Sequence, residues 1–444
     1  MSVSAVFALL AASLAILAGG AKAEMQVIFE PALVKQLKDN GTKTVTVWAN
    51  ESFSFVSVFA ASTHPDVAEV SLESLNFELV NGNHSKYKAN FTVSGKFVGY
   101  TDVILKTFKE GTNVLVDESP ALFVSVIRAS DGSDAVFIGT ISVMMFFMYI
   151  NFGCALNMPL VLKNLKKPIG ITIGLVSQFV FMPVMSFFIA RYVFYDNPAL
   201  QLGLFFIGSS PGGAASNMWT LVLGGNLDLS VTMTAVSTFA SFLTIPFWVF
   251  TLGRLIFENA NIAVPYKEIA FTALSLFIPL LIGIFIQYKL PKVTTFLNKV
   301  LKPFAAICLI FIIFATCYNV FLFKFVTWKL LFGASSNPIL GYIFGAGLAR
   351  IFRQSGPDIL AISIETGIQN GAIAMILLKV ALEPPESDIS AVVIVTIFVA
   401  TQLPLAILLA FFKIRDCVRA KKKINIDLNE TEIPLKQPVP EFKQ

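Results

Sequence analysis

After Asp134 the sequence alternates between long apolar runs and short polar connectors. Most of these runs hold about 20 residues or more, the length at which a helix crosses the roughly 30 Å hydrocarbon core of a bilayer. The pattern therefore predicts nine transmembrane helices, over residues 134–156, 169–192, 199–223, 229–253, 268–288, 303–323, 327–349, 357–381 and 388–412.

Two of the nine runs are interrupted by polar and helix-weakening residues. The run 199–223 contains S-S-P-G-G-A-A-S-N from Ser209 to Asn217, and the run 357–381 contains I-E-T-G-I-Q-N from Ile364 to Asn370. Proline removes a backbone donor and glycine weakens a helix, while a carboxylate such as Glu365 costs roughly 3 kcal/mol at the centre of a span. Because the two runs are five spans apart, they cross the membrane in opposite directions, as paired broken helices of an inverted repeat do.

Residues 24–133 have a different pattern, with short alternating or β-branched runs separated by turn signals such as Asn81-Gly82. About 110 residues of this kind predict one β-sandwich-like domain, although no Cys/Trp/Cys signature supports an immunoglobulin fold. Sequons predict glycosylation of an exported surface at Asn40, Asn50, Asn83 and Asn90. A further sequon at Asn429 falls in the part of the chain that is expected to be cytoplasmic, so we discount it.

The N-terminal segment and the distribution of charge predict how the chain sits in the membrane. Residues 1–23 end in Ala21-Lys22-Ala23 after an apolar run and predict a signal peptide, with an uncleaved anchor as the alternative. An exported domain 24–133, a nine-helix domain 134–412 and a cytoplasmic tail 413–444 follow. Basic residues gather in the connectors predicted to be cytoplasmic and in the tail, whereas Lys324 and Lys329 go against this rule.

Composition supports a polytopic membrane protein, since 55% of the residues are hydrophobic and only 14% are charged. The net charge of +5 follows membrane topology and does not indicate nucleic-acid binding. No cysteine lies between Glu24 and Asp134, so a disulfide framework is excluded there. Both histidines, His64 and His84, lie in the same region, which leaves the membrane part without a histidine base or metal ligand.

Side-chain oxygens near the two interruptions form a candidate cation site. Sodium is a hard ion that takes oxygen ligands, and unwound carbonyls of broken helices can add to them. Serine and threonine in membrane helices more often bond to their own helix, whereas Glu365 is a functional candidate by its position. Lys379 and Asp358 lie near the ends of spans and are expected to face water or headgroups. The candidate oxygens belong to Gln178, Ser216, Asn217, Ser230, Thr234, Glu365 and Gln369.

Three motifs together resemble the bile acid:sodium symporter family: S-S-P-G-G-A-A-S-N, N-L-D-L-S-V-T-M-T and E-T-G-I-Q-N. The likeness covers about Asp134 to Phe412. It implies a core domain of paired, crossing broken helices that moves against a panel domain, with about two co-transported sodium ions. A first sodium site would use Ser216, Asn217, Ser230, Thr234 and Glu365, and a second Gln178, Glu365, Gln369 and the carbonyls of Thr366 and Ile368. Pro211, Gly212, Gly213 and Asn370 would lie next to the substrate.

The long N-terminal domain departs from the bile-acid carriers and resembles an orphan branch of that family. The substrate expected from the resemblance is a small organic anion, such as a bile acid or steroid conjugate, carried by alternating access across the plasma membrane. The alternative is a non-transporting receptor or regulator whose outer domain binds a protein partner. An intramembrane hydrolase is the enzyme alternative, but Tyr195-Asp196 lacks a G-x-G-D partner and serine chemistry lacks a membrane histidine. We therefore expect no enzyme.

Overall fold

The computed structural model describes two compact units, Met1–Asp134 with Glu383–Glu386, and Ala135–Leu382 with Ser387–Gln444. The predicted signal peptide over residues 1–23, the sequons at Asn50 and Asn83 and the apolar run 303–323 lie outside the described residues. Those residues are 26–49, 56–71, 74–80, 86–109, 114–128, 133–156, 158–213, 215–260, 262–297, 299–300 and 326–431.

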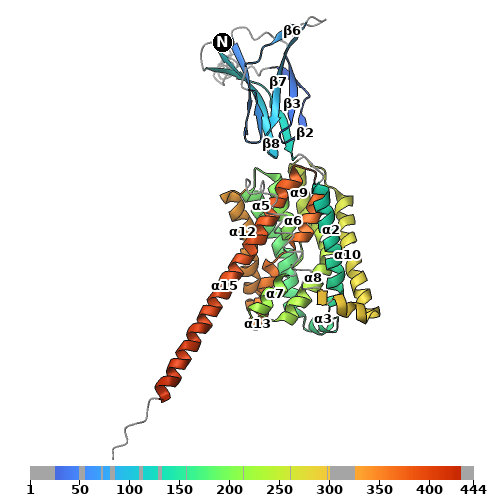
Figure 1. Ribbon diagram of the computed structural model, residues 1–444, viewed down its shortest axis with the longest axis vertical. Coiled ribbons are helices and arrows are strands. Elements are labelled where there is room, and N and C mark those ends of the chain that lie inside the picture. The colour runs from blue at the N-terminus through green and yellow to red at the C-terminus, as the bar shows by residue number, and fades with distance from the viewer. Residues whose placement is uncertain are drawn as a thin grey trace, which may run out of the picture. The chain divides into compact units, whose positions relative to one another are not determined.

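The N-terminal unit consists of two five-stranded sheets (Figure 1). One sheet has the order β1-β3-β7-β5, with β6 also on β7, and the other has the order β2-β10-β8-β4, with β9 also on β8. Strand β2 runs parallel to β10, and the pairs β3–β7 and β4–β8 are antiparallel. The strands are β1 Val27–Glu30, β2 Val34–Lys38, β3 Thr42–Ala49, β4 Val56–Ser62, β5 Ala68–Val70, β6 Glu78–Val80, β7 Lys86–Gly95, β8 Gly99–Lys109, β9 Leu115–Glu118 and β10 Leu122–Ile127.

Alternating residues of both sheets fill one hydrophobic core. Val45 and Val47 of β3 and Leu105 of β8 are fully buried and belong to the same cluster, as the two-residue period of a strand requires. The predicted β-rich N-terminal region is therefore confirmed. Of its glycosylation candidates, Asn40 and Asn90 are exposed.

The second unit is built from helices, seven of which correspond to predicted apolar runs or their halves at nearly the predicted bounds (Figure 1). These are α2 Ser133–Ala155, α6 Pro198–Gly208, α7 Ala215–Val222, α10 Tyr266–Lys289, α12 Trp328–Ile351, α13 Gly356–Gly367 and α14 Gly371–Ala381. Two further spans contain π-helical turns: α4 Pro168–Val176, η1 Ser177–Phe181 and α5 Met182–Val193 form one, and α8 Leu227–Trp248, η2 Val249–Gly253 and α9 Arg254–Asn259 the other.

Within the described part of the chain, four helices are long and apolar enough to cross a bilayer: Pro168–Val193, Leu227–Asn259, Tyr266–Lys289 and Glu386–Arg415. A fifth results if Ser142–Ala155 and α3, Met158–Leu165, are taken as one span bent by 70°. The runs 199–223 and 357–381 are each divided into two shorter helices, as their interruptions predict. The last helix, α15 Glu386–Thr431, continues past residue 412, the predicted end of the membrane domain.

Helix α6 lies at the centre of the helical unit. From Ala199 to Gly208 all of its residues except Leu200 are buried, including the rings of Phe205 and Phe206, as expected of a helix that is apolar on every side. In contrast, Phe271 and Phe285 of α10 and Leu403 of α15 are largely exposed. Such side chains suit contact with lipid.

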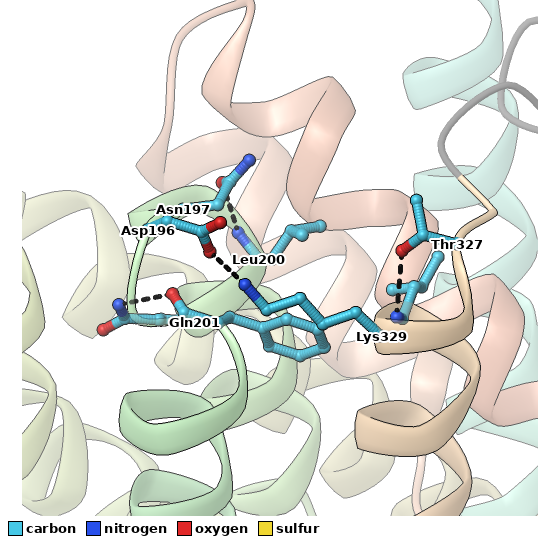
Figure 2. A network of polar contacts seen from close by, with 8 residues as sticks. Asp196, Asn197, Leu200, Gln201, Thr327 and Lys329 are labelled. Atoms are coloured by element: carbon cyan, nitrogen blue, oxygen red, sulfur yellow. Dashed lines mark hydrogen bonds and ion pairs between the residues drawn. The ribbon is translucent and has the colours of Figure 1, made fainter.

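Lys329, which goes against the charge rule, is neutralised locally. Figure 2 shows its ammonium group reaching Asp196 in the connector before α6, where Nζ and Oδ1 are 2.6 Å apart. The same ammonium lies 4.4 Å from the centre of the Tyr195 ring. Asn197 and Thr327 cap α6 and α12 on either side of this pair, so two helix starts position it. This pairing also leaves Asp196 exposed and bound to a lysine, which does not fit a protease aspartate.

The expectation that Lys379 faces water or headgroups is wrong. Its ammonium bonds the Asp388 carboxylate at 2.5 Å, and the two side chains are only 12% and 8% exposed. Helix α14 turns back into α15 through the connector after Leu382, which brings the two charges together. The ion pair with Asp388 therefore takes the place of hydration for the Lys379 ammonium, because an unpaired buried charge would be costly.

Candidate functional site at the crossing of two broken helices

The two helix breaks meet and bond to each other. The Gly213 amide donates to the Ile368 carbonyl at 2.8 Å, and the Asn370 amide donates to the Pro211 carbonyl at 2.9 Å. Gly212 and Gln369 thus form an antiparallel bridge between the α6–α7 and α13–α14 breaks. These bonds satisfy backbone groups that the breaks would otherwise leave unpaired in an apolar environment.

Glu365 lies at this crossing, in the last turn of α13, and is 2% exposed. Three hydroxyl groups donate to its carboxylate: Ser216 to Oε2 at 2.5 Å, Thr234 to Oε1 at 2.7 Å and Ser230 to Oε2 at 3.3 Å. A carboxylate that accepts several hydroxyl bonds is stabilised in its charged form. The arrangement therefore gathers a carboxyl group and three hydroxyl oxygens at one point inside the helical unit.

Two helices, α7 and α8, carry these hydroxyl groups. Ser216 lies in the first turn of α7, and Ser230 and Thr234 are one turn apart on α8, on the same face. The Asn217 side chain joins them, because its Oδ1 lies 2.9 Å from the Ser230 hydroxyl and 3.4 Å from the Thr234 hydroxyl, and each hydroxyl shares its single proton between Asn217 and Glu365. All five residues expected in the first sodium site are thus brought together.

The residues expected in the second site form an adjacent group. Gln178 Nε2 donates to Gln369 Oε1 at 2.5 Å and to the Ser210 carbonyl at 2.6 Å, and Gln369 Nε2 donates to the Thr366 carbonyl at 3.0 Å. The Ile368 carbonyl points across the crossing to Gly213. Glu365 bonds the hydroxyls of the first group, and the chain from Glu365 to Gln369 connects the two groups.

Gln178 lies in the π-helical turn η1. Single π turns within α-helices are frequent at functional sites. Its Oε1 is buried and has no hydrogen-bond partner, which is costly unless another group or an ion binds there. The polarity of Gln178 was visible in the sequence, but neither the π turn nor the contact with the Ser210 carbonyl was predicted.

The glycines of the break allow the two chains to approach. A Cβ on Gly212 would come within 2.9 Å of Glu365 Cδ and would overlap Oε1, while one on Gly213 would come within 2.8 Å of the Gln369 carbonyl oxygen. Pro211, Gly212 and Gly213 are buried, and Asn370 is half-buried and caps α14 by accepting from the Ile373 amide. These four residues line the crossing itself.

The donor set suits a hard monovalent cation. It consists of carboxylate, hydroxyl, amide and carbonyl oxygens, and the described residues contain no cluster of three or more His, Cys, Asp or Glu side chains of the kind that holds a transition metal. A hydroxyl that donates to Glu365 keeps its lone pairs for an ion. The residues present therefore fit sodium.

Comparison with known proteins supports this interpretation of the oxygen groups. The model of the Sodium Bile acid symporter family matches residues 142–323. Hepatic sodium/bile acid cotransporter of Homo sapiens is 31% identical over 246 residues, which cover 55% of this chain and 70% of that protein. The chain belongs to the sodium bile acid symporter family. Its apolar helices and this membership indicate a multi-pass membrane protein.

Other relatives align over less of their own length. P3 protein of Bos taurus is 32% identical over 246 residues, 55% of this chain and 51% of that protein. Sodium-dependent organic anion transporter of Rattus norvegicus is 31% identical over 244 residues, 54% and 64% respectively. The chain thus spans about half the length of the P3 proteins that it matches.

Proposed function

We propose that this protein is a sodium-coupled secondary active symporter that carries a small organic anion, of bile-acid or steroid-conjugate type, by alternating access. The observation that carries this proposal is the buried Glu365 carboxylate, which accepts three hydroxyl bonds at the crossing of two broken helices. A charge in this position is costly and is retained where it binds an ion or substrate. The names of the aligned relatives, an organic anion transporter and a bile acid cotransporter, support the substrate class.

About two sodium ions would bind beside this carboxylate. The first site would use Ser216, Asn217, Ser230, Thr234 and Glu365; the second would use Glu365, the side chains of Gln178 and Gln369, and the carbonyls of Thr366 and Ile368. The unpartnered Gln178 Oε1 supports the second site, since it would otherwise remain an unsatisfied buried acceptor.

The proposed membrane arrangement follows the sequence. Nine transmembrane helices with inverted repeats would form core and panel parts. The signal peptide would be removed, the glycosylated β-sandwich would face outward and the C-terminal tail would face the cytoplasm. The plasma membrane is the proposed location, and the outer domain is a candidate surface for a protein partner.

The test of this function is the substitution Glu365→Gln, which keeps the shape of the side chain and removes its charge. We expect sodium-dependent uptake of taurocholate or of a steroid sulfate to be lost, together with the stabilisation of the purified protein by sodium. Glu383→Gln is the matched control, because Glu383 is exposed, and it should behave as wild type. Unchanged sodium dependence in the Glu365→Gln protein, at normal surface expression, would refute the assignment.

A folded β-sandwich attached to the helical unit favours a second candidate function, that of a receptor or regulator without transport. The complete set of oxygens around Glu365 argues against it, since a scaffold released from transport has no need of a buried carboxylate. Stabilisation by sodium without flux of any organic anion would favour this second function.

A further inference from the structure

Tyr149 of α2 has a buried hydroxyl group with no hydrogen-bond partner. The residue is only 4% exposed and packs in the main hydrophobic core of the helical unit. Buried tyrosine hydroxyls ordinarily find a partner, as that of Tyr342 does by donating to the Thr401 carbonyl at 2.9 Å. Tyr149 therefore keeps an unused donor at an energetic cost.

The Tyr149 hydroxyl lies at the crossing, close to the side chain of Asn370 but without the distance and angle of a hydrogen bond to it. Asn370 has its own Oδ1 engaged by the Ile373 amide at 3.2 Å and its backbone amide engaged by the Pro211 carbonyl. It begins α14, an 11-residue helix, whose N-terminal end carries a partial positive charge that favours anions. The Tyr149 hydroxyl thus lies near the N-terminal end of a half-helix, where negative charge is stabilised.

Helix α2 holds Tyr149 in place through a close contact with α10. A Cβ on Gly153 would come within 2.9 Å of the Gly283 Cα, the Cys154 thiol bonds the Gly283 carbonyl at 3.2 Å, and the Gln287 amide bonds the Leu156 carbonyl. These contacts bind α2 to α10 over the two turns that follow Tyr149. The position of α2, which carries Tyr149, is therefore set by its packing on α10, a different helix from the one that carries Glu365.

We propose that Tyr149 is a specificity-determining residue, whose hydroxyl donates a hydrogen bond to an oxygen of the anionic head group as the substrate passes the crossing. This inference rests on the proposed function and adds the side chain that recognises the head group. The ligand class is an organic anion whose carboxylate, sulfate or sulfonate oxygens only accept hydrogen bonds. Such a group matches both an unpaired donor and the N-terminal end of α14.

The experiment compares Tyr149→Phe with Tyr342→Phe, which each remove one phenol hydroxyl from the helical unit. Sodium-dependent uptake of taurocholate and of a steroid sulfate is measured for both, with thermal unfolding of the purified proteins. For Tyr149→Phe we expect KM to rise about tenfold, as loss of a hydrogen bond to a charged group implies. Maximal rate and sodium half-saturation should stay as in the wild type, and thermal stability should be equal or higher, since no bond within the protein is lost and an unsatisfied buried hydroxyl is removed. Tyr342→Phe should keep KM and lose thermal stability.

Three results would overturn the inference. An unchanged KM in Tyr149→Phe would show that the hydroxyl does not contact the substrate. A loss of thermal stability as large as that of Tyr342→Phe, with a lower maximal rate at constant KM, would show a structural role. Absence of sodium-dependent uptake in the wild type would remove the proposed function and this inference together, whereas the first two results leave the proposed function intact.

Discussion

Replacing Gly212 by alanine tests how closely the carboxylate site depends on the crossing. The added Cβ would overlap Glu365 Oε1 and approach Cδ to 2.9 Å. The atoms in conflict form the end of a flexible side chain, and the backbone of Gly212 does not adopt the left-handed conformation that favours glycine. We therefore expect the protein to fold and the carboxylate to move.

The magnitude follows from the hydrogen bonds that the carboxylate would lose. Oε1 accepts from Thr234 at 2.7 Å, and a hydrogen bond to a charged group contributes about 1.5–3 kcal/mol. At about 1.4 kcal/mol for each tenfold change, loss of this bond weakens sodium binding by roughly 10- to 100-fold. Further movement that also breaks the bond from Ser216 would increase the loss.

The assay is a sodium titration of the purified protein followed by thermal shift. Gly347→Ala is the matched control, because its Cβ would meet nothing within 4 Å on α12; it should bind sodium normally and gain about 0.5–1 kcal/mol in helix stability. Gly213→Ala gives a contrast, since its Cβ would meet the Gln369 backbone and lower thermal stability. Wild-type sodium affinity in Gly212→Ala would refute the reasoning that joins Glu365 to the ion.

Two further predictions concern the buried ion pair and the outer domain. Asp388→Ala should lower the free energy of unfolding by about 3–5 kcal/mol, because it leaves the Lys379 charge buried and unpaired, while the double variant Lys379→Met with Asp388→Leu should recover most of the loss in thermal denaturation. Asn40→Gln and Asn90→Gln, at exposed positions of the β-sandwich, should each remove one glycan, measured as one step in mobility before peptide N-glycosidase treatment and no difference after it.

Much of the candidate site could be predicted because its residues carry local signals. Proline and glycine near Pro211 and the polar stretch around Glu365 predicted two breaks, and the spacing of Ser230 and Thr234 placed both hydroxyls on one helix face. These elements meet through two backbone bonds, Gly213 to Ile368 and Asn370 to Pro211, between residues far apart in the sequence. The family resemblance supplied that pairing, and periodicity alone could not.

The wrong expectation for Lys379 and the exception at Lys329 have the same physical cause, which is pairing with a residue that the sequence pattern does not reveal. Lys379 near the end of a run looks like an exposed residue, and only the return of α15 provides the Asp388 that allows it to be buried. Lys329 likewise breaks the charge rule until Asp196, 133 residues away, is seen beside it. The π turn at Gln178 left no signal, because a single additional residue in a helical turn does not disturb an apolar run.

The bridge between Gly212 and Gln369 has a consequence for how ions would share the site. Two helix ends joined by backbone hydrogen bonds cannot shift independently, and Glu365 lies in the segment that they fix. In the proposed transporter, an ion that tightens one group of oxygens would thereby order the other. Thermodynamic linkage requires this help to be mutual, so each ion would raise the affinity for its neighbour by the same factor. Cooperativity would then be a property of the backbone at the crossing as much as of the ligands around it.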